Sequence, residues 1–167
     1  MHRIPVTGKI GERPAEREEL IDAVLGASRA LVAVAARSLA DLAEDVTLAQ
    51  YRALVELAAR GPQRLADLAS GLGVDPSTAT RMCDRLVRKQ LVQRRRVSAD
   101  RRGVRISLTP AGRALVEEVT RRRRLEIAEI LRRMPHADQG SALTALRVFA
   151  DAAGEVPEQD WSLGWGR

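Results

Sequence analysis

The chain has 167 residues, which suits one compact domain or one domain with an added helical layer. Hydrophobic residues make up 45% of the sequence and aromatic residues only 2%, which excludes extensive disorder and predicts a core of Leu, Val, Ile and Ala. The single cysteine excludes an intramolecular disulfide. No apolar run is long enough for a secretory signal or a transmembrane helix, so we expect a cytoplasmic protein with no membrane partner.

Positive charge is concentrated in one segment. The whole chain carries a net charge of +6, but residues 81–105 contain ten basic side chains and only two acidic ones, Asp84 and Asp100. That segment therefore carries +8, and the rest of the chain carries −2. Such local charge is typical of a surface that binds a polyanion, although a solvated basic face would have the same composition.

The N-terminal part is predicted to contain two helices. Pro and Gly interrupt residues 1–14, which predicts a flexible arm, and from residue 15 to about residue 44 apolar side chains recur at helical spacing. A helix of that length spans roughly 45 Å, and one small monomer cannot easily cover its apolar stripe. A second helix is expected to begin after Thr47, an N-cap, and to end at Gly61 and Pro62. Its inward positions are predicted to be Tyr51, Leu54, Val55 and Ala58.

A helix-turn-helix pattern follows. Leu65, Leu68 and Leu72 mark a short third helix that stops at a glycine-containing turn. Asp75 is a suitable N-cap for a fourth helix, with Pro76 at its first position. A short helix, a tight turn and a second helix are typical of DNA-binding proteins, although many helical hairpins share this pattern.

The fourth helix has two different faces. One face is predicted to be buried, and its members are Ala79, Met82, Cys83, Leu86 and Gln90. The opposite face presents hydroxyl and guanidinium groups, which bond base edges and phosphates. Arg81 is the expected base reader. The full set of expected DNA contacts on this helix is Ser77, Thr78, Thr80, Arg81, Arg85 and Arg88, the last two on phosphates.

A hairpin wing is predicted next. Residues 91–96 and 104–108 read as antiparallel strands, and the intervening loop is rich in arginine. Arginine is attracted into a narrow minor groove, and a neighbouring carboxylate can orient the guanidinium through two hydrogen bonds. The expected DNA contacts of the wing are Arg96, Asp100, Arg101, Arg102 and Arg105.

Two more helices and a tail complete the chain. Thr109 and Pro110 fit the N-cap and first position of a fifth helix, which is expected to stop at Pro135, with a sixth over about 137–153. The arginine run at 121–124 is expected to be solvated. The tail, 154–167, is expected to lack regular structure but to pack through Trp161 and Trp165.

These motifs together resemble the MarR family of winged-helix transcription regulators. The family's wing signature, D-x-R, five residues and L-T, is matched by Asp100-Arg101-Arg102, "GVRIS" and Leu108-Thr109. The resemblance covers roughly residues 18–153. It implies a mainly α fold with a small antiparallel β wing, in which a winged helix-turn-helix is joined to a helical dimerisation layer.

The resemblance also implies a function and a domain division. It implies a homodimer that binds a palindromic operator on double-stranded DNA, acts as a repressor and is released by a small aromatic or phenolic effector, with a pocket near residues 39–51. The implied division is an arm (1–14), a dimerisation helix (15–46), a winged helix-turn-helix domain (47–109), C-terminal dimerisation helices (110–153) and a tail (154–167).

Three other interpretations fit the sequence less well. A winged helix can bind protein without reading bases, and a flat salt dependence of DNA binding would favour that class. An enzyme would need a nucleotide-binding glycine loop or a nucleophile–base cluster, and the sequence contains neither, so no catalytic activity and no cofactor are expected. Oxidant or metal sensing is disfavoured because Cys83 lies on a buried face and His2 and His136 are isolated.

Overall fold

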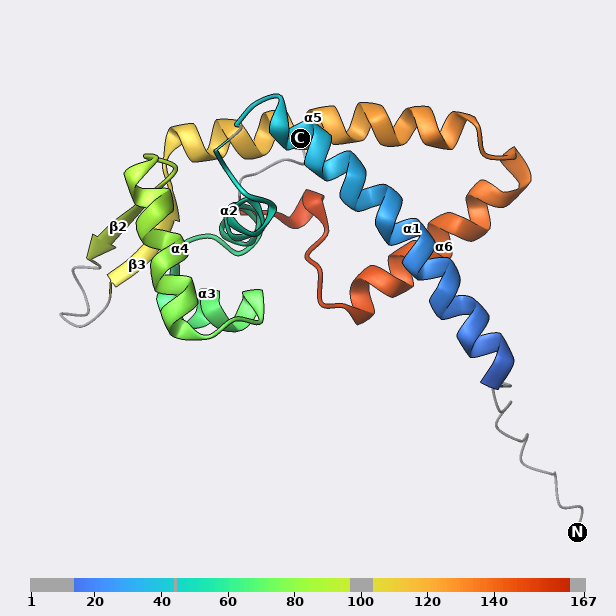
Figure 1. The fold of residues 1–167 in the computed structure, drawn as a ribbon, viewed down its shortest axis with the longest axis horizontal. Helices are drawn as coiled ribbons and strands as arrows, with labels where there is room; N and C mark the ends of the chain where they lie inside the picture. The colour runs from blue at the N-terminus through green and yellow to red at the C-terminus, as the bar shows by residue number, and fades with distance from the viewer. Residues whose placement is uncertain (1–13, 44, 97–103, 163–167) are drawn as a thin grey trace, which may run out of the picture.

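The computed structural model describes residues 14–43, 45–96 and 104–162, which are mainly helical with one small antiparallel sheet (Figure 1). The expected fold class is therefore confirmed. The arm expected at residues 1–14 lies almost wholly outside the described residues. In chain order the elements are α1 (Pro14–Ala40), α2 (Leu48–Arg60), β1 (Gln63–Arg64), α3 (Leu65–Leu72), α4 (Pro76–Arg88), β2 (Val92–Arg96), β3 (Val104–Leu108), α5 (Pro110–Arg132), α6 (His136–Ala152) and a 3₁₀ turn (Glu158–Asp160).

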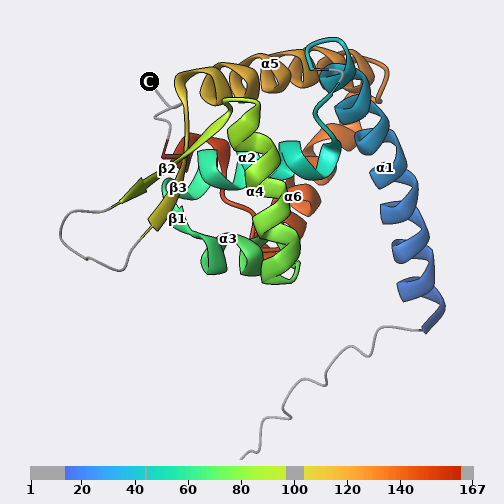
Figure 2. The same ribbon diagram turned by 60° about the vertical axis from the view of Figure 1, so that its left-hand side comes forward.

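Helices α2, α3 and α4 and the sheet form one lobe around a shared hydrophobic core (Figure 2). Leu68 of α3, Leu86 of α4 and Ile106 of β3 are completely or almost completely buried in it. Most of α2 is also buried, including the four positions predicted to face inward, Tyr51, Leu54, Val55 and Ala58.

The helix ends follow the capping residues. Thr47 and Gln50 form a reciprocal capping box at α2, because each side-chain oxygen accepts a hydrogen bond from the other's backbone N–H at 3.2 Å. Asp75 caps α4 and Thr109 caps α5, each followed by proline. Gly61, with φ of 76°, lies directly after α2. The boundaries predicted at Thr47, Gly61, Asp75 and Thr109 are confirmed, whereas α5 ends at Arg132, short of the stop expected at Pro135.

The sheet has one more strand than the sequence predicted. The strand order is β1-β3-β2, and both pairs are antiparallel. The expected wing hairpin is formed by β2 and β3, with Val92 opposite Leu108. The third strand, β1, has two residues, which is too short for any alternation of polar and apolar positions to appear in the sequence.

Two sequence predictions near helix ends were wrong. Gln90 was placed on the buried face of the fourth helix, but α4 ends before it, and Gln90 is exposed with φ of 58°. Its backbone turns the chain from α4 into the wing. The first helix was expected to continue to about residue 44, but it ends at Ala40.

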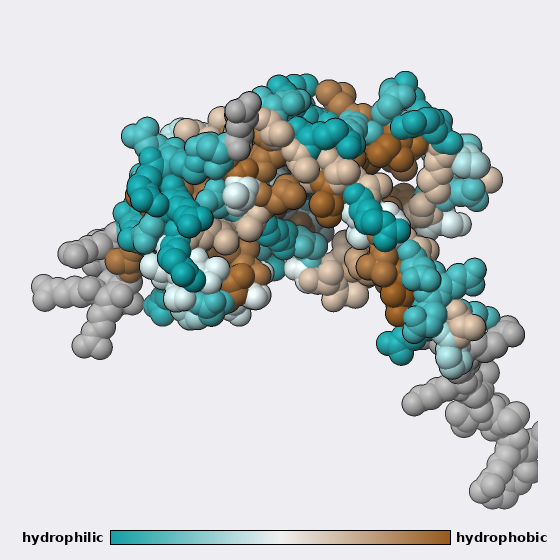
Figure 3. All heavy atoms as spheres, in the orientation of Figure 1, coloured by the Kyte–Doolittle hydropathy of each residue, from teal (hydrophilic) through white to brown (hydrophobic). Residues whose placement is uncertain are grey.

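Helices α1, α5 and α6 extend beyond the lobe (Figure 1). α1 packs against α5, but many of its large apolar side chains are exposed, and α6 has no buried residue and contacts the other described elements only sparsely. Figure 3 shows hydrophobic surface along α1 and near the far end of α5. The exposed apolar residues of the three helices include Leu20, Ile21, Leu25, Leu31, Val32, Leu125, Ile130, Leu131, Leu143, Leu146, Val148 and Phe149.

Three of the four arginines at 121–124 pair with carboxylates, and the expected solvation holds for Arg121 and Arg124, whose side chains remain largely exposed. Arg121 donates two hydrogen bonds of 2.7 Å to Glu118, and Arg122 bonds both Glu118 and Asp41 of the segment after α1. Arg124 pairs with Glu158. These contacts join α5 to α1 and to the tail.

The tail folds back onto α2. Trp161 is buried, as expected, and its indole N–H donates to the carbonyl oxygen of Val156 at 2.9 Å. Ser162 donates its backbone N–H to the carbonyl of Ala59 and its hydroxyl to that of Ala58. The tail was expected to be irregular, but a 3₁₀ turn precedes Trp161; Trp165 lies outside the described residues. None of the helices in the described ranges combines the length and apolar character needed to span a bilayer.

Candidate nucleic-acid interface

Helix α4 lies on the surface of the lobe with its two faces as predicted. Ala79, Cys83 and Leu86 are buried, and Met82 is half-buried. The other side presents Ser77, Arg81, Arg85 and Arg88, all of which are exposed. The structure therefore brings the expected recognition-helix residues onto one accessible face.

The first turn of α4 is held by the Asp75 carboxylate. Asp75 Oδ1 accepts hydrogen bonds from the Ser77 hydroxyl (2.6 Å) and the Thr78 backbone N–H (2.9 Å), and Oδ2 accepts from the Thr78 hydroxyl (2.8 Å). These bonds, that of Ser77 first, hold the pKa of Asp75 well below its usual value. The sequence predicted Asp75 as a helix cap, but it did not show that the Ser77 and Thr78 hydroxyls also donate their hydrogens to this carboxylate.

This arrangement limits what the hydroxyls of α4 can do. The Thr80 hydroxyl also donates within the protein, to the carbonyl oxygen of Pro76 at 2.7 Å. A hydroxyl has one hydrogen, so Ser77, Thr78 and Thr80 can accept from a base amino group but cannot donate to a phosphate while these bonds persist.

Arg81 is oriented by the same cluster. Its Nη2 donates to Thr78 Oγ1 at 3.3 Å, and Thr78 in turn donates to Asp75. A guanidinium has five N–H donors, so this contact leaves donors available for a planar acceptor such as the edge of guanine.

Arg85 and Arg88 have no ion pair with any described residue. The acid nearest to them in sequence, Asp84, instead pairs with Arg94 of β2 at 2.6 Å. Lys89 pairs with Asp45. Because Asp84 and Asp45 pair elsewhere, no acid of the described residues neutralises Arg85 or Arg88, unlike in an ordinary salt-bridged surface helix.

Of the expected wing contacts, the structure describes only Arg105 in full. Its exposed side chain donates to the carbonyl oxygen of Pro62 at 3.1 Å. Arg96 ends β2, but its side chain lies outside the described residues, as do Asp100, Arg101 and Arg102. The sequence prediction did not include Arg94, which joins the wing to α4, or Arg95, which shares the outer sheet face with Arg105. Because side chains alternate along a strand, residues 92–96 could have been used to place Arg94 and Arg95 on opposite faces of the sheet.

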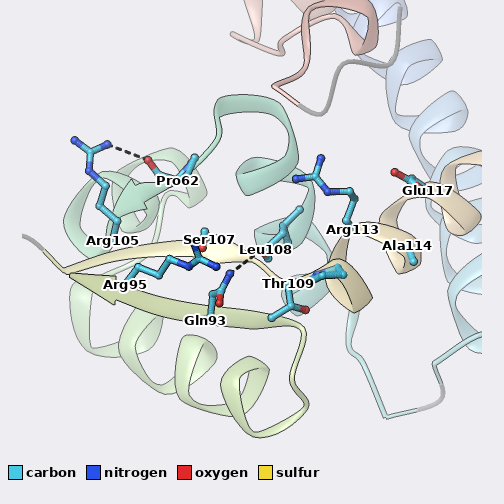
Figure 4. Close-up of a pocket in the computed structure, with 11 residues that line it drawn as sticks. Pro62, Gln93, Arg95, Arg105, Ser107, Leu108, Thr109, Arg113, Ala114 and Glu117 are labelled. Carbon is cyan, nitrogen blue, oxygen red and sulfur yellow. Dashed lines mark hydrogen bonds between the residues drawn. The ribbon is translucent and has the colours of Figure 1, made fainter. Parts of the chain in front are cut away.

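An open cavity of about 780 Å³ lies between the outer sheet face, Pro62 and the start of α5 (Figure 4). Figure 4 shows Arg105 at one end, Arg113 and Glu117 of α5 at the other, and Arg95 between them. Pro62, Leu108, Pro110 and Ala114 supply apolar walls.

A buried polar cluster lies where α2 meets α5. The Tyr51 hydroxyl and Arg123 Nε are both buried, and neither has a hydrogen-bond partner among the described residues. Burial raises the pKa of the Tyr51 phenol, while neighbouring Thr120 and Arg123 oppose that shift. Thr120 and Arg123 therefore lie within interaction distance of the buried phenol, and together the three side chains form a polar cluster between α2 and α5.

The described residues offer little for redox or metal chemistry. Burial raises the pKa of the Cys83 thiol, which keeps it protonated and unreactive. No three His, Cys, Asp or Glu side chains within the described ranges are grouped closely enough to hold a metal ion.

Comparisons with known proteins agree with this geometry. The family model described as "MarR family" matches residues 46–104. The transcriptional repressor MdtR of Bacillus subtilis is 32% identical over 123 residues, covering 74% of this chain and 79% of MdtR. The crystal structure of RV1404 from Mycobacterium tuberculosis is 42% identical with a TM-score of 0.80, over 88% of this chain and 99% of that one.

A third protein has a known regulator. Bordetella bronchiseptica BpsR, whose DNA binding is regulated by 6-hydroxynicotinic acid, is 26% identical with a TM-score of 0.60. The match covers 79% of this chain and 98% of that one.

Proposed function

This chain belongs to the MarR family of DNA-binding transcriptional regulators, and we propose that it is a homodimeric repressor released from a palindromic operator by a small ligand. The family consists of regulators rather than enzymes, which confirms the expectation that the chain is not a catalyst. The observation that carries the DNA-binding role is the row of outward arginines on α4 whose charge no described acid neutralises.

In this proposal α4 enters the major groove. Arg81, oriented through Thr78, reads a base edge, and Ser77, Thr78 and Thr80 accept from base amino groups. Arg85 and Arg88 contact phosphates, which fix register without reading sequence. The wing, with Arg96, Asp100, Arg101, Arg102 and Arg105, forms the second contact, in the minor groove.

The exposed apolar surface supports the homodimer. Leu20 of α1 is 63% exposed and Phe149 of α6 is 56% exposed, and a monomer rarely leaves so large an apolar surface in water. We therefore assign residues 15–46 and 110–153 to the dimerisation layer and residues 47–109 to the DNA-binding domain. Two-fold symmetry then favours half-sites about 10–10.5 base pairs apart.

Two relatives support repression and ligand control. MdtR is a repressor, and BpsR is regulated by an aromatic acid. In this chain the Tyr51 hydroxyl and Arg123 Nε, close to the expected effector region at 39–51, are buried polar atoms beside the junction of α2 and α5. An aromatic or phenolic acid bound there would alter how the lobe sits on α5.

Binding to a library of duplexes at several salt concentrations tests this function. Arg81→Ala should relax preference at one base pair by about 1–3 kcal/mol, because a bidentate contact would be lost. Arg85→Ala should weaken all duplexes alike and lower the slope of log K against log salt by about 0.9. Arg133→Ala, on the far end of α5, is the matched control. A wild-type protein with no salt-dependent duplex binding would favour a protein-binding module instead.

A further inference from the structure

The outer face of the sheet carries like charges side by side. Arg95 of β2 lies directly opposite Arg105 of β3, and Arg105 also lies opposite Arg64 of β1. Like charges in directly opposed positions destabilise an antiparallel pair. A counter-charge near Arg95 and Arg105 would remove this repulsion.

The described part of the chain supplies little of that counter-charge. The Arg105 side chain is bonded to a carbonyl oxygen, whereas the side chains of Arg95 and Arg113 form no hydrogen bond or ion pair with another described residue. Arg113 does not pair with Glu117, although the two are four residues apart on α5 and both line the cavity. Two guanidiniums are therefore available in one concave site.

The chemistry of the lining defines the occupant. Three arginines and one glutamate give the cavity a formal charge of +2, which a dianion would balance. Pro62, Leu108 and Ala114 give it apolar walls. The buried Ser107 hydroxyl, which also lines it, has no hydrogen-bond partner among the described residues and can rotate toward a ligand oxygen.

We propose that this cavity binds a small organic dianion with an apolar body, such as a phosphate monoester, held between Arg95 and Arg113. The site is separate from the buried Tyr51 cluster and from the outward face of α4. Its volume of about 780 Å³ is in the range of small-molecule sites.

Such a ligand would act as a second control of DNA binding; this consequence, unlike the site itself, depends on the proposed function. Arg95 belongs to the wing and Arg113 to α5, so a bound dianion ties these elements across the Thr109 junction and neutralises charge beside the wing (Figure 4). The neutralised charge weakens the attraction of the wing for phosphates, and by linkage DNA would weaken binding of the dianion equally.

Titration of the full-length protein with phenyl phosphate at pH 8, followed by calorimetry and by amide NMR shifts, tests the site. We expect saturable binding with shifts in β2, β3 and the first turns of α5. Arg95→Gln and Arg113→Gln should each weaken it about tenfold or more, since bonds to charged groups are lost. Arg133→Gln should bind as the wild type does, and benzoate, a monoanion, should bind more weakly than phenyl phosphate.

Several results would overturn the proposal. These are no saturable binding, binding that both cavity variants retain, or equal loss in Arg133→Gln. If phenyl phosphate fails to bind while both cavity variants lose duplex affinity and salt slope, the arginines contact DNA phosphates instead. Because wild-type duplex binding is measured separately, failure of the anion site is distinguishable from failure of the regulator function.

Discussion

Gly112 is the position where a single added carbon should do most harm. It lies in the first turn of α5, where the helix passes directly over the backbone of Leu91 at the start of the wing. A Cβ at residue 112 would lie 2.0 Å from the Leu91 carbonyl oxygen and 2.9 Å from its carbon. An ordinary contact begins at 3.4 Å, so the two backbones must separate by about 1.4 Å to accept alanine.

The expected loss follows from three effects of different sign. Overpacking of this kind costs about 1–3 kcal/mol. The Leu91 oxygen also accepts the Thr109 N–H at 3.1 Å, and losing that bond costs about 1 kcal/mol more. Alanine gains up to about 1 kcal/mol of helix propensity over glycine. Gly112→Ala should therefore lower the free energy of unfolding by about 1–3 kcal/mol.

Thermal unfolding followed by circular dichroism, at one fixed protein concentration, measures this. A loss of about 2 kcal/mol lowers the Tm by about 4–8 °C for a chain of this size. Gly140→Ala is the matched control, because it is also a helical glycine but has no atom within 4 Å of the added carbon. Its Tm should stay unchanged or rise.

A Gly112→Ala protein that melts at or above the wild-type temperature would refute this reasoning. It would mean that α5 does not approach Leu91 as closely as described. Equal losses in the two variants would assign the effect to glycine replacement in general rather than to this contact.

Three further predictions concern other parts of the molecule. Trp161→Ala should release the tail from α2 and lower the free energy of unfolding by up to about 3 kcal/mol, with faster proteolysis at the C-terminal end as the readout. Gly71→Ala should lower the urea midpoint by less than Gly112→Ala does, since its Cβ would meet the end of the Glu56 side chain at 2.6 Å rather than a backbone carbonyl. Hydrogen bonds from two arginines of its own helix lower the pKa of Glu118 from 4.5 to about 2, so its contribution to stability is present above pH 4.5 and lost as the pH falls toward 2. Acid titration of Glu118→Gln should show a smaller loss of folding stability between pH 4.5 and 2 than the wild type shows. Equal losses would contradict a stabilising role for the Glu118 carboxylate.

Local signals predicted most of the fold. Thr47, Asp75 and Thr109 each place an oxygen that caps a helix, and proline follows two of them, so the boundaries depend on neighbouring residues alone. The faces of α4 followed from helical periodicity for the same reason. Part of the wing signature, Asp100 to Arg102, lies outside the described residues, but the family model matched over 46–104 confirms the resemblance.

The features that were missed depend on contacts between distant segments. The two-residue β1 exists only because β3 offers it a partner. The close approach of Gly112 to Leu91, and the pairing of Asp84 with Arg94 rather than with its own helix, need the tertiary fold. Gln90 was misplaced because a helical projection of the sequence can be continued beyond Arg88, where the helix ends.

Because the tail returns to α2, the chain is held on both sides of α6. One end continues from α5, and the other is anchored by Ser162 on the carbonyls of Ala58 and Ala59. Between its two ends, α6 makes few contacts with the rest of its own chain. We therefore expect a displacement of α6 to be felt at the end of α2, through residues 153–162.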